Sequence, residues 1–271
     1  YANSVAVSPD GKHVYVAAYE ADAVAWFDRD AVTGALTFVS EYANSTTLDG
    51  AYCVTVSPDG KHVYVAAYQA NRIAWFTRNT ETGDLTYGGG YDIGGFPSIV
   101  GITISPDGKH AYVTDINGIV TWFARNAANG SLSLIGSHSD GGTIGGACSI
   151  VISTDGNHAY VTAFSTDAVA WFTRDDTDGA LTYVDSYSDP NIDYAYSVTL
   201  SPDGYTAYVA ARNANALAWF TRDTSTGGLT YEDRIVDTYI LGAQSVAVSP
   251  DGNHAYVAAY GASSAAWFTI H

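Results

Sequence analysis

Histidine and arginine, which can move protons and bind anions, recur in this sequence at a fixed spacing. Five histidines stand two residues after an Asp-Gly turn: His13, His62, His110, His158 and His254. Five arginines follow a Trp-Phe pair: Arg29, Arg78, Arg125, Arg174 and Arg222. Side chains that repeat in this way are typical of a scaffold. We therefore predict that the arginines pair with turn carboxylates such as Asp10 rather than with a ligand.

The residues that differ between repeats are the better candidates for a binding site. One variable position comes just before an expected strand and carries Asn3, Tyr52, Val100, Cys148, Tyr196 and Gln244. The other comes at the end of the next expected strand and carries Tyr19, Tyr68, Asp115, Phe164, Arg212 and Tyr260. Three arginines lie outside the repeated Trp-Phe-x-Arg position: Arg72, Arg212 and Arg234. We expect the two variable sets to lie at the same end of the fold, around the mouth of a central channel.

Such a mouth is rich in tyrosine, and aromatic faces stack on sugar rings while charged and amide groups fix orientation. We predict a ligand-binding set that consists of Asn3, Tyr19, Tyr52, Tyr68, Asp115, Cys148, Phe164, Tyr196, Arg212, Gln244 and Tyr260. Only Asp115 and Arg212 in this set are charged, so no catalytic residue is predicted. His138 stands outside the repeat without a neighbouring nucleophile or metal-ligand partner at a telling spacing.

These positions are set by a repeat that runs through the whole chain. Ser-Pro-Asp-Gly, or Ser-Thr-Asp-Gly at Ser153, recurs every 48 or 49 residues, and each copy is followed by one of the six Trp-Phe pairs. Each complete repeat contains four short runs rich in Val, Tyr, Trp, Phe and Thr, separated by Gly-containing turns. No window has the 3.6-residue period of a helix. The sequence predicts an all-β, six-bladed propeller of four-stranded antiparallel blades.

The predicted single domain covers residues 1–271, with repeats at 1–49, 50–97, 98–145, 146–193, 194–241 and 242–271. The last repeat stops inside its third strand. We therefore predict that blade six has three strands here, and that residues preceding Tyr1 in a longer precursor, or a partner, complete it. Otherwise Ala265–Ile270 is an open edge that can pair with another chain.

Charge and composition narrow the class of partner. The chain has 271 residues and a formal net charge of -17, which disfavours nucleic acid and anionic lipid surfaces. No apolar run is long enough to span a bilayer. The two cysteines, Cys53 and Cys148, are too few for a disulfide framework and are expected to be buried thiols. No cofactor is predicted; linker residues Asn44, Asp92, Asp140, Asp189 and Asp237 allow weak Ca²⁺ binding at most.

Two segments connect the chain to known families: Ser4–Ala17, with Ser-Pro-Asp-Gly-Lys-His-Val-Tyr-Val-Ala, and Asp28–Val39, with Thr-Gly-Ala-Leu-Thr. These repeats resemble those of the YVTN-repeat and lactonase-like β-propellers, over the whole chain. The lactonase resemblance implies a seven-bladed enzyme that opens sugar lactones or cyclises related acids. The YVTN resemblance implies a surface or exported protein. Six closely similar repeats depart from the lactonase pattern.

From the residues alone, we expect an exported, extracellular or periplasmic propeller without enzymatic activity, which binds a small polar or glycan-like ligand, or a protein or peptide, at the channel mouth. Two alternatives stay open. The chain is a lactonase-like hydrolase acting at the same mouth, or it is a structural scaffold that assembles through its open edge.

Overall fold

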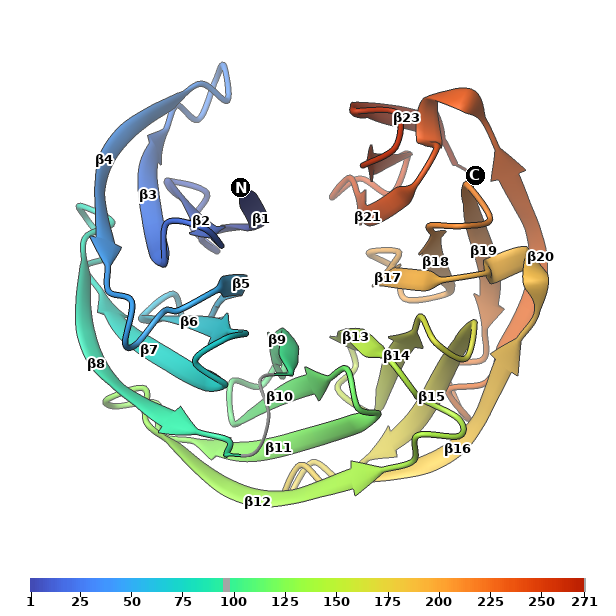
Figure 1. Ribbon diagram of the computed structural model, residues 1–271, viewed down its shortest axis with the longest axis horizontal. Helices are drawn as coiled ribbons and strands as arrows, with labels where there is room; N and C mark the ends of the chain where they lie inside the picture. Colours follow the sequence, from blue (N-terminus) through green and yellow to red (C-terminus); the bar gives the residue numbers. More distant parts are fainter. Residues whose placement is uncertain (95–97, 271) are drawn as a thin grey trace. The chain divides into compact units, whose positions relative to one another are not determined.

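The computed structural model describes residues 1–94 and 98–270, and its strands form the sheets of an all-β, six-bladed propeller. Five sheets have four antiparallel strands in sequence order, and the sheet of blade six has three, β21-β22-β23. Figure 1 shows the strands coloured along the chain and labels most of them. The fold class and the three-stranded last blade predicted from the sequence are both confirmed.

The first three blades contain twelve strands: β1 (Ala2–Val7), β2 (His13–Ala18), β3 (Ala23–Arg29), β4 (Leu36–Ala43), β5 (Ala51–Val56), β6 (His62–Ala67), β7 (Arg72–Arg78), β8 (Leu85–Asp92), β9 (Ile99–Ile104), β10 (His110–Asp115), β11 (Ile119–Arg125) and β12 (Leu132–Ser139). The other three contain β13 (Ala147–Ile152), β14 (His158–Ala163), β15 (Ala168–Arg174), β16 (Leu181–Ser188), β17 (Ala195–Leu200), β18 (Thr206–Ala211), β19 (Ala216–Arg222), β20 (Leu229–Val236), β21 (Ala243–Val248), β22 (His254–Ala259) and β23 (Ser264–Thr269). Two short 3₁₀ turns, η1 (Pro190–Ile192) and η2 (Thr238–Ile240), lie in linkers between blades.

In blades two and four, the second strand has apolar residues on both faces, and both faces are covered by other parts of the protein. Every residue of β6, His-Val-Tyr-Val-Ala-Ala, is buried, and β14 has the same pattern. A blade cannot bury two apolar faces alone, so it must stack on neighbouring blades. Within the described residues, no helix is long and apolar enough to cross a membrane.

The chain divides into two compact units, one of residues 1–113 and 121–136 and the other of residues 114–120 and 137–271. Each unit has its own cores between neighbouring blades. In the first unit, Trp26 and Phe76 share one core, and in the second unit Trp171 and Phe220 share another. Trp26 and Trp171 thus fill space between blades, as their repetition predicts, whereas Trp267 of blade six has 65% of its surface exposed.

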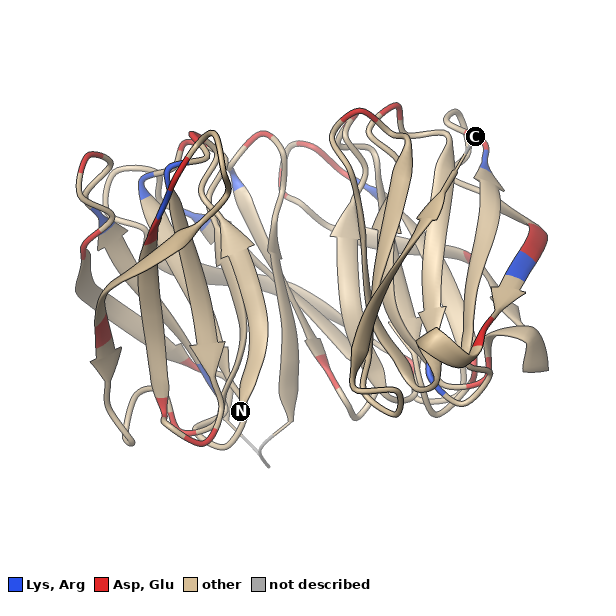
Figure 2. Cartoon of the chain, turned by 90° about the horizontal axis from the view of Figure 1, so that it is seen from above, with Lys and Arg blue, Asp and Glu red and all other residues tan. Residues whose placement is uncertain are grey.

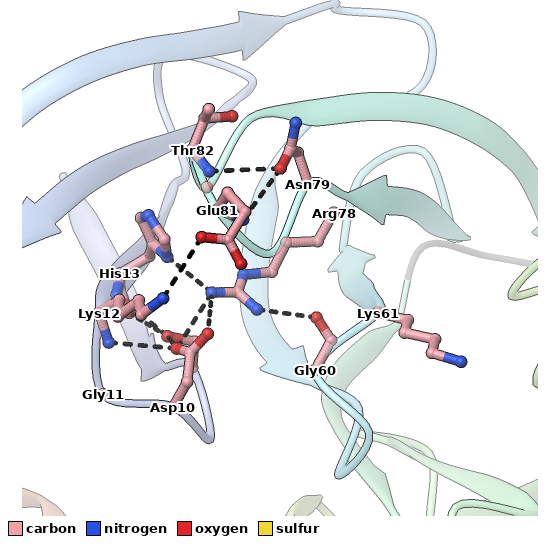
Figure 3. A network of polar contacts seen from close by, with 12 residues as sticks. Asp10, Gly11, Lys12, His13, Gly60, Lys61, Arg78, Asn79, Glu81 and Thr82 are labelled. Atoms are coloured by element: carbon pink, nitrogen blue, oxygen red, sulfur yellow. Dashed lines mark hydrogen bonds and ion pairs between the residues drawn. The ribbon is translucent and has the colours of Figure 1, made fainter.

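The repeated arginine locks one blade to the next. A terminal nitrogen of Arg78 in blade two donates to the Asp10 carboxylate at 2.8 Å and to Nδ1 of His13 at 2.6 Å (Figure 3). Its Nε donates to the Tyr15 hydroxyl at 2.8 Å. We call the three receiving side chains the arginine socket. Arg125 fills the socket of blade two, and Arg222 fills that of blade four. The predicted pairing with turn carboxylates is confirmed for Arg78, Arg125 and Arg222, and the partner belongs to the preceding repeat. Arg29 donates to the Gly11 carbonyl instead.

The socket of blade five differs in two positions that face each other across repeats. Thr206 stands where the other sockets have histidine, and Ile270 of blade six stands where arginine is expected. Ile270 packs in an apolar core with Tyr208 instead. The histidine and the arginine are therefore both replaced at this junction, which is consistent with a direct contact between them at the other junctions.

Charged residues lie in the turns and linkers and also on outer strands, such as Glu232, Asp233 and Arg234 of β20 (Figure 2). The first two strands of each blade, in contrast, contain no Asp, Glu, Lys or Arg except Asp115 of β10. These strands can therefore pack on both faces without burying unpaired charge. The turns at one end carry the sockets, and the variable residues lie at the other end.

Candidate functional site

Both variable positions lie at one end of each blade, because the backbone joins them there. Arg212 follows β18, and its amide donates to the carbonyl of Tyr194 at 3.0 Å, directly before β17. Equivalent bonds link Tyr19 to Tyr1 at 2.9 Å and Tyr260 to Gly242 at 3.0 Å. The prediction that the two sets share one end of the blade holds within each of these blades.

The first variable position has a structural signature that the sequence did not reveal. In blades one, two, four, five and six, the pairing of the first two strands shifts register at this residue, so that it is a β-bulge; the skipped residues are Asn3, Tyr52, Cys148, Tyr196 and Gln244. A bulge redirects a side chain out of the regular pleat. The scaffold thus presents these residues differently from their strand neighbours.

In the first compact unit, three predicted residues form what we call the tyrosine cluster: Tyr19, Tyr52 and Tyr68. Their ring centroids are 6.1 to 6.4 Å apart. The amide of Gln69 donates to the Tyr19 hydroxyl at 2.9 Å. The cluster is therefore a half-buried aromatic surface without a charged side chain of its own.

In the second compact unit, aromatic rings lie close to the guanidinium of Arg212. Phe164 and Tyr194 stack with their centroids 4.7 Å apart, and Tyr194 is nearly parallel to Tyr196 at 6.1 Å. The guanidinium carbon of Arg212 lies 5.6 Å from the Tyr194 centroid and 5.1 Å from that of Tyr260. We call these five residues the arginine platform. Four of them were predicted from the sequence.

Arg212 differs from the other arginines outside the repeated position in having no polar partner. Arg72 pairs with Asp92 at 2.5 Å, and Arg234 donates to the Asn191 carbonyl at 3.2 Å. Among the described residues, the Arg212 guanidinium donates no hydrogen bond and pairs with no carboxylate. A half-buried guanidinium held between two rings, with its N–H groups uncommitted, is suited to accept a carboxylate, a phosphate or a developing oxyanion.

Tyr194 is the platform residue that sequence reasoning missed, although the repeat contains the information. The equivalent positions hold Gly50, Gly146 and Gly242, all with positive φ. Tyr194 adopts the same left-handed conformation, with a φ of 60°. The other described non-glycine residues with positive φ are Asn, Asp or Ser. A bulky residue in this region costs free energy, and such strain is concentrated at functional sites.

Three other predicted site residues, Cys148, Asp115 and Asn3, are not part of the platform or of the tyrosine cluster. Cys148 is buried, and its thiol points to the Tyr196 carbonyl at 3.1 Å; burial raises its pKa to about 12. Asp115 is also buried and accepts the Asn117 amide at 2.6 Å, so it holds a turn. Asn3 is exposed at the start of β1. These placements do not bring Cys148 or Asp115 to the surface of the platform.

No group of three potential metal ligands occurs among residues 1–94 and 98–270. The linker residues considered for Ca²⁺ have other partners. The Asp140 carboxylate accepts the amides of Gly142 and Thr143, and Asp189 and Asp237 cap η1 and η2. Each oxygen so used is less available to a cation.

The fold is a β-propeller whose repeats vary in sequence at one end of the blades. The model of the family described as "Lactonase, 7-bladed beta-propeller" matches residues 1–101 and 101–238, so the chain belongs to this family. No curated protein matches the chain.

Solved structures share the fold at low identity. A Bacteroides fragilis protein provisionally named a 6-phosphogluconolactonase is 22% identical with a TM-score of 0.84, over 99% of this chain and 80% of that chain. The periplasmic gluconolactonase of Pseudomonas aeruginosa is 20% identical with a TM-score of 0.84, over 99% and 81%. A Lactobacillus plantarum protein is 21% identical with a TM-score of 0.85, over 100% and 81%.

The family match corrects the main functional expectation. A non-enzymatic binding protein was expected because few charged residues break the repeat. That prediction is wrong, since membership of the lactonase family favours the hydrolase alternative. The expectation rested on the small number of charged residues that break the repeat, and that number does not decide whether a propeller is an enzyme.

Proposed function

We propose that the chain is a hydrolase that opens a sugar lactone at the arginine platform. The observation that carries the proposal is the uncommitted Arg212 guanidinium, fixed between Tyr194 and Tyr260 in a chain of the lactonase family. The names of solved neighbours, a gluconolactonase among them, support a sugar lactone as substrate. The stacked rings of Phe164 and Tyr194 provide a flat surface for the sugar ring.

Lactone opening requires water to attack the carbonyl carbon. The carbonyl oxygen gains negative charge, the ring C–O bond then breaks, and its oxygen takes up a proton, which yields a hydroxy acid. Arg212 is positioned to stabilise that charge and then to pair with the new carboxylate. Its preorganised N–H groups need no rearrangement during the reaction.

Asp193 is the proposed general base. It precedes Tyr194, and its carboxylate accepts a hydrogen bond from the Asn213 side chain at 3.3 Å. The backbone pairs Asp193 with Asn213 and Tyr194 with Arg212, so the carboxylate and the guanidinium come from adjacent residues of two paired segments. A half-buried carboxylate beside the platform can take the proton of the attacking water.

The test is hydrolysis of a panel of aldonolactones, including glucono-δ-lactone, followed by pH-stat titration with the spontaneous rate subtracted. We expect Arg212→Gln to lower kcat/KM about 100-fold or more. Asp193→Asn is expected to lower kcat by about 100-fold and to remove the acid limb of the pH profile. Arg72→Gln is the matched control, because Arg72 is also a non-repeated arginine but pairs with Asp92.

Absence of catalysed opening of every lactone in the panel by the wild-type chain would disprove the proposal. Equal losses in Arg212→Gln and Arg72→Gln would show that the platform is not the reaction site. Asp115→Ala distinguishes a further case: because Asp115 holds a turn, its loss should lower stability more than it changes kcat.

We also propose an exported location. One solved neighbour is named a periplasmic gluconolactonase, and the high negative charge with few lysines suits such a location. Fractionation of the source cells with an antibody against the chain tests this. Recovery of the protein only with cytosolic markers would refute it.

A further inference from the structure

Tyr194 occupies a backbone position that the scaffold reserves for glycine. Its amide donates to the Asp167 carboxylate at 2.8 Å, as the amides of Gly50 and Gly242 donate to Asp22 at 3.0 Å and to Asn215 at 2.7 Å. The conformation is therefore imposed by the turn of the preceding blade and not by the tyrosine. The tyrosine side chain has to tolerate it.

The same position is also crowded in the other repeats. A Cβ atom added at Gly50 would lie 3.0 Å from the Gln69 amide nitrogen, and one added at Gly146 would lie 2.7 Å from the Ser165 hydroxyl. Glycine avoids both the left-handed penalty and this crowding. A tyrosine with both the left-handed penalty and the crowding is expected only where its ring makes a favourable interaction.

What the ring provides is a fixed position for Arg212. The guanidinium carbon lies over the Tyr194 ring, 5.6 Å from its centroid, and over the Tyr260 ring, 5.1 Å from its centroid. Tyr260 has 70% of its surface exposed, whereas Tyr194 is half-buried and stacked on Phe164 and Tyr196. Tyr194 is therefore the rigid side of the pair. A guanidinium stacked in this way keeps its N–H edge free in its own plane, which suits a planar or tetrahedral anion.

We propose that Tyr194 is a specificity-determining residue, which holds Arg212 for an anionic group on the substrate and so favours charged lactones over neutral ones. This inference rests on the proposed lactone hydrolysis for its kinetic consequence, but the anion site exists independently of catalysis. Tyr194 is a positioning residue for Arg212, and its ring is a contact surface for the ligand.

The decisive experiment restores the residue of the other repeats. Binding of gluconate and of 6-phosphogluconate, which are stable ring-opened acids, is measured by titration calorimetry on the full chain. Tyr194→Gly should bind both anions about 10-fold more weakly, because the cation–π contact and the fixed geometry are lost. Its thermal midpoint should stay equal to that of wild type or rise by a few degrees, because the strained residue is gone.

Two further variants separate the ring from the backbone. Tyr194→Asn accepts the left-handed conformation but has no ring, so it should lose anion binding as Tyr194→Gly does. Tyr194→Phe keeps the ring and should keep binding within about 2-fold. In hydrolysis assays, Tyr194→Gly should lower kcat/KM for both lactones, because the sugar-stacking ring is lost, and should lower it about 10-fold more for 6-phosphogluconolactone than for the neutral glucono-δ-lactone.

The outcomes are distinct. Unchanged anion affinity in Tyr194→Gly, or loss of affinity in Tyr194→Phe, overturns the inference even if lactones are hydrolysed. Anion binding that depends on the Tyr194 ring, in a chain that opens no lactone, supports the inference and overturns the proposed function. A lower thermal midpoint in Tyr194→Gly would overturn the claim that the residue is strained.

Discussion

Blade one and blade six carry the same arginine socket, but only one of them is filled. In blade one, Arg78 contacts Asp10, His13 and Tyr15, and Tyr15 is completely buried. The corresponding residues of blade six are Asp251, His254 and Tyr256, and Tyr256 has 48% of its surface exposed. Among the described residues, none of these three contacts an arginine.

The comparison separates the turn, which a repeat forms by itself, from the burial of the socket side chains, which requires a neighbouring blade. Asp251 still accepts the Ser249 hydroxyl at 2.5 Å and the Asn253 amide at 3.0 Å, as Asp10 does with Ser8 and Lys12. The turn therefore forms from local sequence. Burial of the tyrosine and histidine requires the next blade. Identical residues in the two blades should consequently differ in their contribution to stability.

The largest expected effect is the loss of the arginine itself. Arg78→Ala leaves the Asp10 carboxylate and the Tyr15 hydroxyl without their charged partner and should lower the free energy of unfolding by about 3–5 kcal/mol. Arg29→Ala is the matched control. Among the described residues, the Arg29 guanidinium donates only to the Gly11 carbonyl, at 3.2 Å, so its loss should cost no more than about 1 kcal/mol. Urea unfolding of both variants measures the difference, and equal losses would break the comparison.

A second pair tests the space beside the socket. A Cβ atom at Gly83 would overlap the His13 ring, whereas one at Gly34 of blade one meets nothing within 4 Å. Both glycines have positive φ, so both alanine variants carry the same backbone penalty. Gly83→Ala should be less stable than Gly34→Ala by about 1–3 kcal/mol, the usual cost of overpacking. Thermal unfolding under identical conditions would show a similar midpoint for both variants if the His13 contact were unimportant.

The tyrosine hydroxyl gives a smaller and more specific effect. The Tyr15 hydroxyl donates to the Gly83 carbonyl at 2.9 Å and accepts from Arg78. Burial raises the pKa of Tyr15 to about 12. Tyr15→Phe should cost about 1–3 kcal/mol because a buried donor and acceptor lose their partner, and Tyr256→Phe should be nearly neutral. If Tyr256→Phe destabilises the chain as much as Tyr15→Phe, the blade-six socket is filled in solution.

The smallest effect is a dependence of stability on pH. Burial, and then the charge of Arg125, lowers the pKa of His62 below 6.5. The folded state therefore binds fewer protons than the unfolded state, and stability falls as pH drops below about 6.5. Burial raises the pKa of Asp59, but hydrogen bonds from Ser57 and Arg125 outweigh it and hold the pKa at about 2. Further stability is lost as pH falls from about 4 towards 2.

Urea unfolding at pH 7.5, 5.5 and 4 checks this prediction. His62→Gln should flatten the dependence between pH 7.5 and 5.5, because it removes a buried histidine whose pKa is lowered in the folded state. Stability that rises as the pH falls through this range would contradict the assignment of His62 as a buried neutral residue.

The sequence by itself determined the blade. The 48-residue period, the Pro-Asp-Gly turns and the short Val- and Tyr-rich runs specify four strands and their order, because strand pairing within a blade depends on nearby residues. It also separated scaffold from site: His13 and Arg78 recur in the repeat and are structural, and Arg212 does not recur and is uncommitted.

Only the tertiary structure decided which residues meet between repeats. It showed that an arginine fills the socket of the preceding blade, that the first variable residue is a bulge, and that Tyr194 holds Arg212. Tyr194 was not predicted from the sequence, because glycine at three equivalent positions indicated only a turn, and the tyrosine in the fifth repeat was not recognised as a departure from it. Contacts between blades join residues more than forty positions apart, and no local pattern encodes their relative geometry. That geometry placed an uncommitted guanidinium between two aromatic rings.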